Sequence, residues 1–396
     1  MAVVALVIAV AGCSSSDPEP SNSTDPSTAP PTSLADTAAP TTSSPPSSAA
    51  PATTTGIVGV KLDQPGPMAV GVTTISLGDR DAEVWYPVEP GDTEGLENDS
   101  YSTLEILPED LQELLADIDT PVETDAYRDA PSAAEGPYPL MIYSHGAAGY
   151  RKVATFNNTH LASWGFVVAS IDHLERGLLA SNGLLDLPER DGGDVEDVMT
   201  TIDMLVSADD PLLGGLVDGE QVAIMGHSAG GFTAVRAAQA DDRIDTFISW
   251  ASAGDPESAD LPTIPTQFVA ADGDIAIAPS ETQAFYDALE GPRQMVVLDN
   301  AGHNSFTDAC EPIYEIGGLS QVAEALGLPQ NLVALGEDGC VPDAGFTEPT
   351  EFFALLNHLT LSHVAAVFEL DIDADPLDPA VTELYPGLIE SFDTAP

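Results

Sequence analysis

Basic side chains are scarce in this sequence. Ten Lys and Arg residues face 65 Asp and Glu among 396 residues, the formal net charge is −55, and Lys61 and Lys152 are the only lysines. An electric field of this sign repels nucleic acid and anionic lipid headgroups, so we expect neither as a partner. The carboxylate surplus fits two explanations equally well: adaptation to a saline habitat, or a compositional bias of the whole genome.

Long apolar runs are also missing. The apolar segment 1–12 is shorter than the roughly 20 residues of a membrane span, and no later stretch is apolar enough to supply one. The segment leads into Val10-Ala11-Gly12-Cys13, the residue order of a bacterial lipoprotein signal. We expect 1–12 to be a cleaved signal peptide and Cys13 to be lipidated, so that the lipid anchors an exported protein to the outer face of the membrane. This segment lacks the usual early Lys or Arg, and the alternative is an uncleaved apolar end.

Cysteine occurs only three times. If Cys13 carries lipid, Cys310 and Cys340 remain as one pair in an oxidising compartment, which predicts a disulfide. Closing a loop of about 30 residues would stabilise the fold by roughly 3 to 4 kcal/mol in the chain-entropy model. The alternative is two buried free thiols.

Composition divides the chain into a tether and a folded part. Residues 13–55 are almost entirely Ser, Thr, Pro, Ala and Asp without apolar periodicity, which predicts a disordered linker. The remaining 56–396 are enough for one large catalytic domain. Within it, the polar and Pro-rich stretch 91–136 is expected to be an insertion over the sheet.

The hydrophobic pattern of 56–396 predicts an α/β fold. Two alternating runs at 71–77 and 82–88 predict antiparallel edge strands. Short buried runs then alternate with helical stretches, which is typical of a mainly parallel, doubly wound sheet with helices on both faces. The predicted parallel strands are 140–144, 166–172, 221–226, 246–252, 266–270 and 294–298, and the clearest helices are 194–205, 232–240 and 352–370, the last of which should close the sheet.

The strongest chemical motif surrounds Ser228. A buried-strand run at 221–225 leads into Gly226-His227-Ser228-Ala229-Gly230-Gly231, and a helical stretch follows. Strand, G-x-S-x-G turn and helix together form a nucleophile elbow, in which side chains at Gly226 and Gly230 would collide with neighbouring backbone. The helix amino terminus directs its amides toward the site. Ser228 is therefore the candidate nucleophile.

A serine nucleophile needs a histidine base, and in this fold the base follows it in the sequence. Three histidines follow Ser228. His303 lies directly after the last predicted parallel strand, where catalytic groups of open α/β sheets gather, and is the candidate base. His358 and His363 fall within the final helix and are expected to be structural.

The base needs a carboxylate that fixes its tautomer. Asp274 and Asp272 both follow the strand 266–270. We choose Asp274, with Asp272 second. Asp255, which follows the preceding strand, is a further candidate because some hydrolases of this fold place the acid there.

Backbone N–H groups must stabilise the oxyanion that forms when serine attacks a carbonyl. The amide of Ala229 is one expected donor. The loop after the first parallel strand, Ser144-His145-Gly146-Ala147-Ala148-Gly149, should supply the second, and Ala147 is our choice. The alternative for this loop is an ordinary Gly-rich turn.

No motif suggests a cofactor. The sequence contains no H-E-x-x-H, no C-x-x-C pair, no phosphate-binding Gly-Lys-Ser/Thr loop and no G-x-G-x-x-G. We therefore expect neither a metal nor a nucleotide.

Several motifs together resemble a known group, the bacterial relatives of platelet-activating-factor acetylhydrolase and the predicted dienelactone hydrolases, with polyester hydrolases and cutinase-like esterases as more distant relatives. They are Gly71-Val72-Thr73-Thr74, Glu83-Val84-Trp85-Tyr86-Pro87, Tyr143-Ser144-His145-Gly146, Leu161-Ala162-Ser163-Trp164-Gly165-Phe166-Val167-Val168-Ala169, Gly226-His227-Ser228-Ala229-Gly230-Gly231 and Ala301-Gly302-His303-Asn304-Ser305-Phe306-Thr307-Asp308.

The resemblance implies an α/β-hydrolase fold with Ser228 as nucleophile and His303 as base, and it places Ala147 and Ala229 at the oxyanion. The acetylhydrolase branch implies Asp255 as the acid, whereas the dienelactone and polyester branches imply Asp274. The expected activity is serine carboxylic-ester hydrolysis of an extracellular short-acyl, lipid-like or polyester substrate. Two alternatives remain: an acyltransferase with the same triad, and a non-catalytic surface binding protein on a hydrolase scaffold.

Overall fold

The computed structural model describes residues 61–106, 112–113, 116, 121–181, 187, 193–315, 317–319, 330–341, 344–373 and 375–396. The expected signal peptide 1–12, the expected lipidation site Cys13 and the expected linker 13–55 lie outside these residues.

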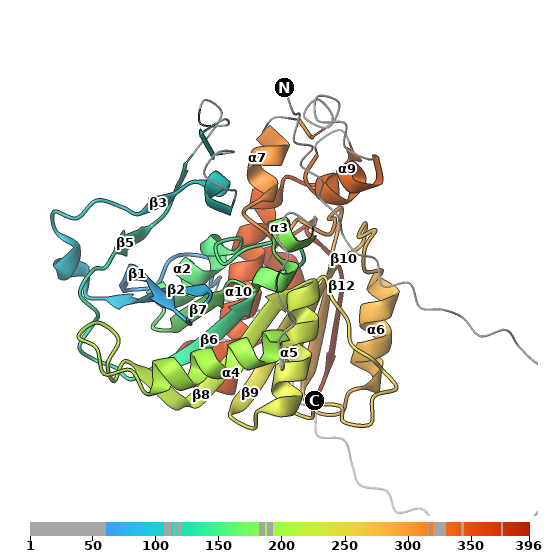
Figure 1. The fold of residues 1–396 in the computed structure, drawn as a ribbon. Coiled ribbons are helices and arrows are strands. Elements are labelled where there is room, and N and C mark those ends of the chain that lie inside the picture. Colours follow the sequence, from blue (N-terminus) through green and yellow to red (C-terminus); the bar gives the residue numbers. More distant parts are fainter. Residues whose placement is uncertain are drawn as a thin grey trace, which may run out of the picture. The chain divides into compact units, whose positions relative to one another are not determined.

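A ten-stranded sheet forms the centre of the described fold (Figure 1). The strand order is β12-β11-β10-β9-β8-β6-β7-β2-β1-β5. The six central strands run parallel to one another, and each contains or closely matches a predicted strand. These are β6 (Tyr138–Ser144), β7 (Val167–Ile171), β8 (Val217–His227), β9 (Ile244–Trp250), β10 (Thr266–Ala271) and β11 (Arg293–Leu298).

The predicted antiparallel pair at the start is confirmed, but it does not form the edge. β1 (Ala69–Ser76) and β2 (Asp81–Val88) pair antiparallel, and β2 also pairs antiparallel with β7. The short β5 (Ala126–Arg128) covers the outer side of β1. Three residues are too few to show an alternating pattern, so the sequence did not reveal this strand.

The stretch 91–136 is only partly an insertion, because β5 belongs to the main sheet. Before β5 it forms a separate two-stranded sheet of β3 (Ser100–Tyr101) and β4 (Val122–Glu123). Two short 3-10 helices accompany them, Pro90–Thr93 and Thr103–Ile106.

The long helix near the end of the chain does not close the sheet, which corrects the prediction. α10 (Pro349–Val367) is followed by α11 (Val381–Leu384) and by β12 (Ile389–Ala395), which pairs antiparallel with β11. β12 is half-exposed along its length, so its residues lack the apolar run of a central strand. The apolar pattern of the sequence therefore could not show that one more strand follows α10.

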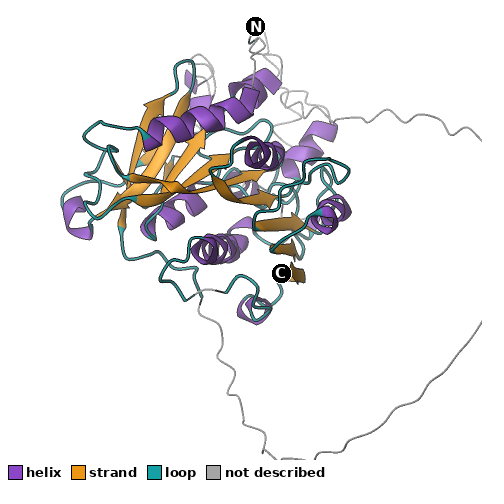
Figure 2. Cartoon of the chain, turned by 90° about the horizontal axis from the view of Figure 1, so that it is seen from below, coloured by secondary structure: helices purple, strands orange, loops and turns teal. Residues whose placement is uncertain are grey.

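Helices cover both faces of the sheet (Figure 2). Along β8, Val222 and Ile224 pack into one apolar cluster, while Ala223 and Met225 pack into the other. Successive strand residues point to opposite faces, so a strand buried on both sides is apolar throughout. One cluster includes residues of α2 (Thr155–Ser163) and α10, and the other includes residues of α4 (Gly193–Val206), α5 (Ala229–Ala240) and α6 (Pro279–Ala288).

Shorter helices lie in the loops beyond the carboxyl ends of the parallel strands (Figure 1). They are the 3-10 helix Leu174–Arg176, α3 (Leu178–Ser181), α7 (Cys310–Glu315) and α9 (Gln330–Glu337). Among the described helices none combines the length and the apolar character that a membrane crossing requires.

Candidate active site

Ser228 occupies the sharp turn between β8 and α5. Its backbone has φ 54° and ψ −122°, a strained conformation for a residue with a side chain. A Cβ on Gly226 would lie 2.2 Å from the carbonyl carbon of Gly230, and one on Gly230 would lie 1.8 Å from the carbonyl oxygen of Ser144. The predicted steric need for both glycines is confirmed, and the turn leaves the Ser228 side chain partly exposed.

Loops after β8, β10 and β11 bring Ser228, Asp274 and His303 together. The Ser228 hydroxyl lies 2.9 Å from Nε2 of His303, and Nδ1 of His303 lies 2.8 Å from Oδ2 of Asp274. Because a carboxylate only accepts, Nδ1 donates to Asp274, and Nε2 is left to accept the proton of Ser228. Oδ1 of Asp274 accepts the N–H groups of Ala276 and Ile277 at 2.7 and 2.8 Å, which fixes the carboxylate in place.

The alternative acids lie elsewhere. Asp255 is exposed, and its carboxylate accepts the N–H of Glu257 in a local turn at 2.9 Å. Asp272 accepts the N–H of Ala301 at 3.0 Å and so ties the loop after β10 to the loop after β11. Of the three candidate carboxylates, the structure brings Asp274 to the imidazole of His303.

The loop of Ala147 is shaped by residues that the sequence did not single out. The N–H of Ala148 donates to the carbonyl of Arg176 at 2.7 Å, and Ala148 itself has φ 59°. The Arg176 guanidinium is held by Ser144 at 2.6 Å and by Asp194 at 2.6 Å. No hydrogen bond to another described residue occupies the N–H of Ala147 or of Ala229. Both amides are therefore available to a ligand at Ser228.

His227, the residue before Ser228 in the elbow motif, also contributes to the site. Its Nε2 donates to the carbonyl oxygen of His303 at 2.7 Å. Burial lowers the pKa of His227 to about 3, so its ring is neutral and has one N–H to donate. This hydrogen bond fixes the main-chain carbonyl of His303.

The other histidines are buried and serve local contacts. His358 accepts the N–H of Leu62 at 2.9 Å, and His363 contacts the hydroxyl of Thr246 at 2.7 Å. Burial lowers the pKa of both to about 4, so they are neutral at physiological pH. Within the described ranges no group of three or more His, Cys, Asp or Glu side chains is arranged to hold a metal ion.

A cavity of about 320 Å³ opens beside Ser228 and His303. Ala147 and Gly146 border it on one side, and the described residues that line it include no Asp, Glu, Lys or Arg. Its apolar wall is built from Val153, Leu178, Pro312, Ile313 and Leu335. In a chain of net charge −55, this is an uncharged place for a ligand.

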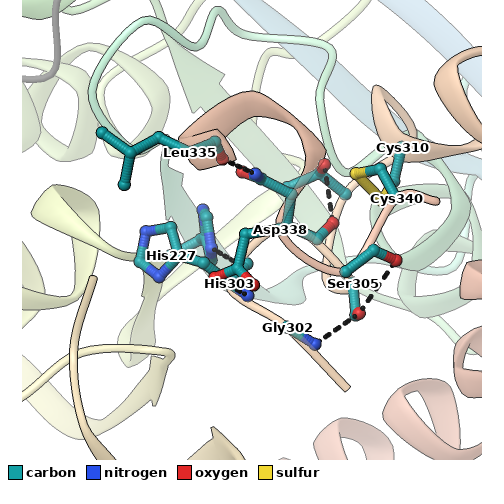
Figure 3. The surroundings of a disulfide bond; sticks show 11 residues. His227, Gly302, His303, Ser305, Cys310, Leu335, Asp338 and Cys340 are labelled. Atoms are coloured by element: carbon teal, nitrogen blue, oxygen red, sulfur yellow. Dashed lines mark hydrogen bonds between the residues drawn. A yellow bond between two sulfur atoms is a disulfide. The ribbon is translucent and has the colours of Figure 1, made fainter. Parts of the chain in front are cut away.

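Cys310 and Cys340 form a disulfide, as the cysteine count predicted, and Cys340 lines the same cavity. Figure 3 shows the bond close to the loop of His303. Both half-cystines are fully buried.

Known proteins with similar sequences share this region. A PET hydrolase-like family model matches residues 131–319, which include Ser228, Asp274 and His303. Bis(hydroxyethyl) terephthalate hydrolase of Streptomyces coelicolor is 29% identical over 177 residues, 44% of this chain and 53% of the relative. Platelet-activating factor acetylhydrolase of Cavia porcellus is 24% identical over 295 residues, 61% of this chain and 67% of the relative. Lipase 1 of a Moraxella species is 26% identical over 159 residues, 40% of this chain and 46% of the relative.

The doubly wound sheet and the elbow serine define the α/β-hydrolase fold class. Within this class the chain is related to PET hydrolase-like proteins and to platelet-activating factor acetylhydrolases, which confirms the resemblance seen in its motifs. The names of the relatives support the expected enzyme class, a hydrolase of carboxylic esters. The matches cover about half of the Streptomyces and Moraxella proteins and two thirds of the acetylhydrolase.

Proposed function

We propose that this protein is a serine carboxylic-ester hydrolase that works through a covalent acyl-enzyme. The observation that carries the proposal is the hydrogen-bond chain from Ser228 through His303 to Asp274, which borders an uncharged cavity. Such a series of hydrogen bonds converts a weakly nucleophilic serine hydroxyl into a reactive one. No cofactor is required by this chemistry.

In the proposed mechanism each group has a role that its position supports. The Ser228 hydroxyl attacks the ester carbonyl while Nε2 of His303 takes its proton, and Asp274 orients the imidazole and stabilises the imidazolium. The amides of Ala147 and Ala229 donate to the oxyanion, each contributing about 3 to 4 kcal/mol to transition-state stabilisation. His303 then protonates the leaving alcohol, and a water molecule activated by the same imidazole hydrolyses the acyl-enzyme.

The cavity favours an uncharged substrate. Its apolar wall suits a short acyl chain, a lipid-like ester or a segment of a polyester, and the net charge of −55 repels carboxylate-bearing esters. We expect p-nitrophenyl butyrate to be hydrolysed with a higher kcat/KM than the p-nitrophenyl monoester of succinate. The difference should shrink as NaCl is raised, because salt screens the long-range part of the repulsion.

A fluorophosphonate reagent tests the nucleophile. Wild-type protein should be labelled and should hydrolyse p-nitrophenyl esters, whereas Ser228→Ala should fold normally, resist labelling and lose roughly 10⁴- to 10⁶-fold in rate. A folded wild type that is neither labelled nor active would instead favour a binding protein on a hydrolase scaffold. Addition of acceptor alcohols to the assay would reveal acyl transfer as a new ester product.

We further propose that the protein is exported and lipid-anchored on the outer face of the membrane. The Val10-Ala11-Gly12-Cys13 order and the Cys310–Cys340 disulfide support this location, because disulfides persist in oxidising compartments. Radiolabelled palmitate fed to expressing bacteria should be incorporated into the wild type and not into Cys13→Ala. Equal labelling of the two proteins would remove Cys13 as the lipidation site.

A further inference from the structure

The segment before Cys340 contacts both loops that carry the proposed base and acid. Oδ2 of Asp338 accepts the main-chain N–H of His303 at 3.0 Å and that of Ile275, the residue after Asp274, also at 3.0 Å. Figure 3 shows Asp338 between His303 and the disulfide. A single carboxylate oxygen therefore joins the loop after β11 that carries His303, here called the base loop, to the loop after β10 that carries Asp274.

More contacts hold the base loop against this segment. The N–H of Asn304 donates to the carbonyl of Asp338 at 2.9 Å, and its side-chain amide donates to the carbonyl of Leu335 at 2.8 Å. The close approach depends on two glycines, because a Cβ on Gly302 would lie 2.3 Å from the nitrogen of Gly339. Gly339 has φ +88°, a conformation that side chains disfavour.

The disulfide anchors the segment to the same region. Cys340 lies two residues after Asp338, and its partner Cys310 begins α7, which follows the base loop directly. The crosslink therefore limits how far Asp338 can move from His303 and from Asp274. One end of the segment is therefore tied to Asn304 through the carbonyl of Leu335, and the other is tied to the start of α7 through the disulfide.

A carboxylate at this position lowers stability unless its hydrogen bonds are made. Asp338 is 3% exposed, and no described Lys or Arg forms a salt bridge with it. Burial raises the pKa of Asp338, while the N–H groups of Ile275 and His303 act in the opposite direction. Without Asp338, the buried N–H of His303 and the part-buried N–H of Ile275 would lack their acceptor.

We propose that Asp338 is a positioning residue for the hydrolase reaction: it fixes the main chain of His303 relative to the loop of Asp274, so that the imidazole is aligned with both Asp274 and Ser228. This inference rests on the proposed function. His303 is then held at all its polar groups, by Asp338 at its N–H, by His227 at its carbonyl, and by Asp274 and Ser228 at its ring.

Three substitutions of Asp338 separate its acceptor role from its charge. Asp338→Ala removes the acceptor and should lower kcat and the fluorophosphonate labelling rate by roughly 10- to 100-fold while KM for p-nitrophenyl butyrate stays within about twofold. Asp338→Asn retains an amide oxygen that can accept both N–H groups and should recover most of the loss. Asp338→Glu keeps the charge but moves the carboxylate oxygen away from the two N–H groups, so it should lower kcat and the labelling rate. This variant tests the proposal even if Asp338→Ala does not fold.

A matched control is Asp241→Ala. Asp241 is also a buried carboxylate that accepts a main-chain N–H, that of Arg243 at 3.1 Å, but it lies at the far end of α5 from Ser228. Its removal should lower the unfolding temperature and leave kcat unchanged. The downfield proton resonance of Nδ1 of His303 should weaken or shift in Asp338→Ala and stay in place in Asp241→Ala.

The outcomes distinguish this inference from the proposed function. Labelling of folded Asp338→Ala at the wild-type rate would overturn the positioning role, and so would an Asp338→Asn variant as slow as Asp338→Glu. A wild-type protein that is not labelled at all would overturn the proposed function. Rescue by Asp338→Asn, together with an unaffected Asp241→Ala, would support the positioning role.

Discussion

At the scale of single residues, hydrogen bonding to His303 distinguishes the candidate acids of the proposed triad. Asp274 hydrogen-bonds to His303, whereas Asp255 is exposed and bonds only within its own turn. We expect Asp274→Asn to lower kcat by about 10⁴-fold, because an amide no longer fixes the imidazole tautomer. Asp255→Asn, measured in the same esterase assay, should keep wild-type kcat. The opposite pattern would assign the acid to Asp255.

Another residue-scale prediction concerns Asp308, whose carboxylate accepts N–H groups at the start of α2. Burial raises the pKa of Asp308 to about 7 from an ordinary value of 3.8. Between these values the folded protein keeps a proton that the unfolded chain has lost, so this residue makes stability fall as pH rises through the window. Above about pH 7 its contribution is constant.

Asp308→Asn cannot ionise and should remove that pH dependence. Relative to wild type, its free energy of unfolding should be higher at pH 8 than at pH 5, by about 1.4 kcal/mol for each pH unit between pH 5 and the folded-state pKa of about 7. Urea denaturation at the two pH values measures this. Asp255→Asn, which removes one exposed carboxylate, provides the comparison for the loss of a surface charge at both pH values.

At the scale of elements, the elbow depends on the contact between α5 and β6. A Cβ on Gly230 would meet the backbone of Ser144, which no side-chain rotation can relieve. Gly230→Ala should therefore destabilise the protein by about 3 kcal/mol and slow fluorophosphonate labelling. Gly91→Ala is the control, because a Cβ there meets no atom within 4 Å, and its stability should stay within about 0.5 kcal/mol of wild type. Urea denaturation measures both effects, and an equal free energy of unfolding for Gly230→Ala and Gly91→Ala would contradict the steric argument.

At the scale of the whole molecule, the carboxylates greatly outnumber the cations that could neutralise them. Among the Lys and Arg residues that the structure describes, only Arg293 makes no salt bridge. Several others, such as Arg80 with Glu175 and Asp197, pair within or near the interior. The remaining surface carboxylates repel one another, which destabilises the folded state at low salt.

We expect NaCl to raise the unfolding temperature, with most of the gain below about 1 M, where the Debye length falls to about 3 Å. Near the sequence pI of about 4.1 the same titration should have little effect, because the net charge is then small. Differential scanning calorimetry across NaCl concentrations checks both statements. A gain that continues steeply to several molar would show stabilisation beyond screening and would support adaptation to a saline habitat.

The sequence by itself determined the features that depend on residues close to one another along the chain. The strand runs, the elbow around Ser228 and the position of His303 after the last parallel strand were all visible, because strand period and turn chemistry depend on residues close along the chain. The cysteine count was enough to predict the pair Cys310 and Cys340.

The tertiary structure alone decided which distant residues meet. Among 65 acidic residues, the sequence favoured Asp274 but could not exclude Asp255, and no local pattern points to Asp338, which bonds to the main chain of a residue 35 positions away. Arg176 likewise shapes the loop of Ala147 from another strand end. The physical reason is that a hydrogen bond to a backbone N–H requires only proximity and direction, and these arise when the sheet brings its loops together.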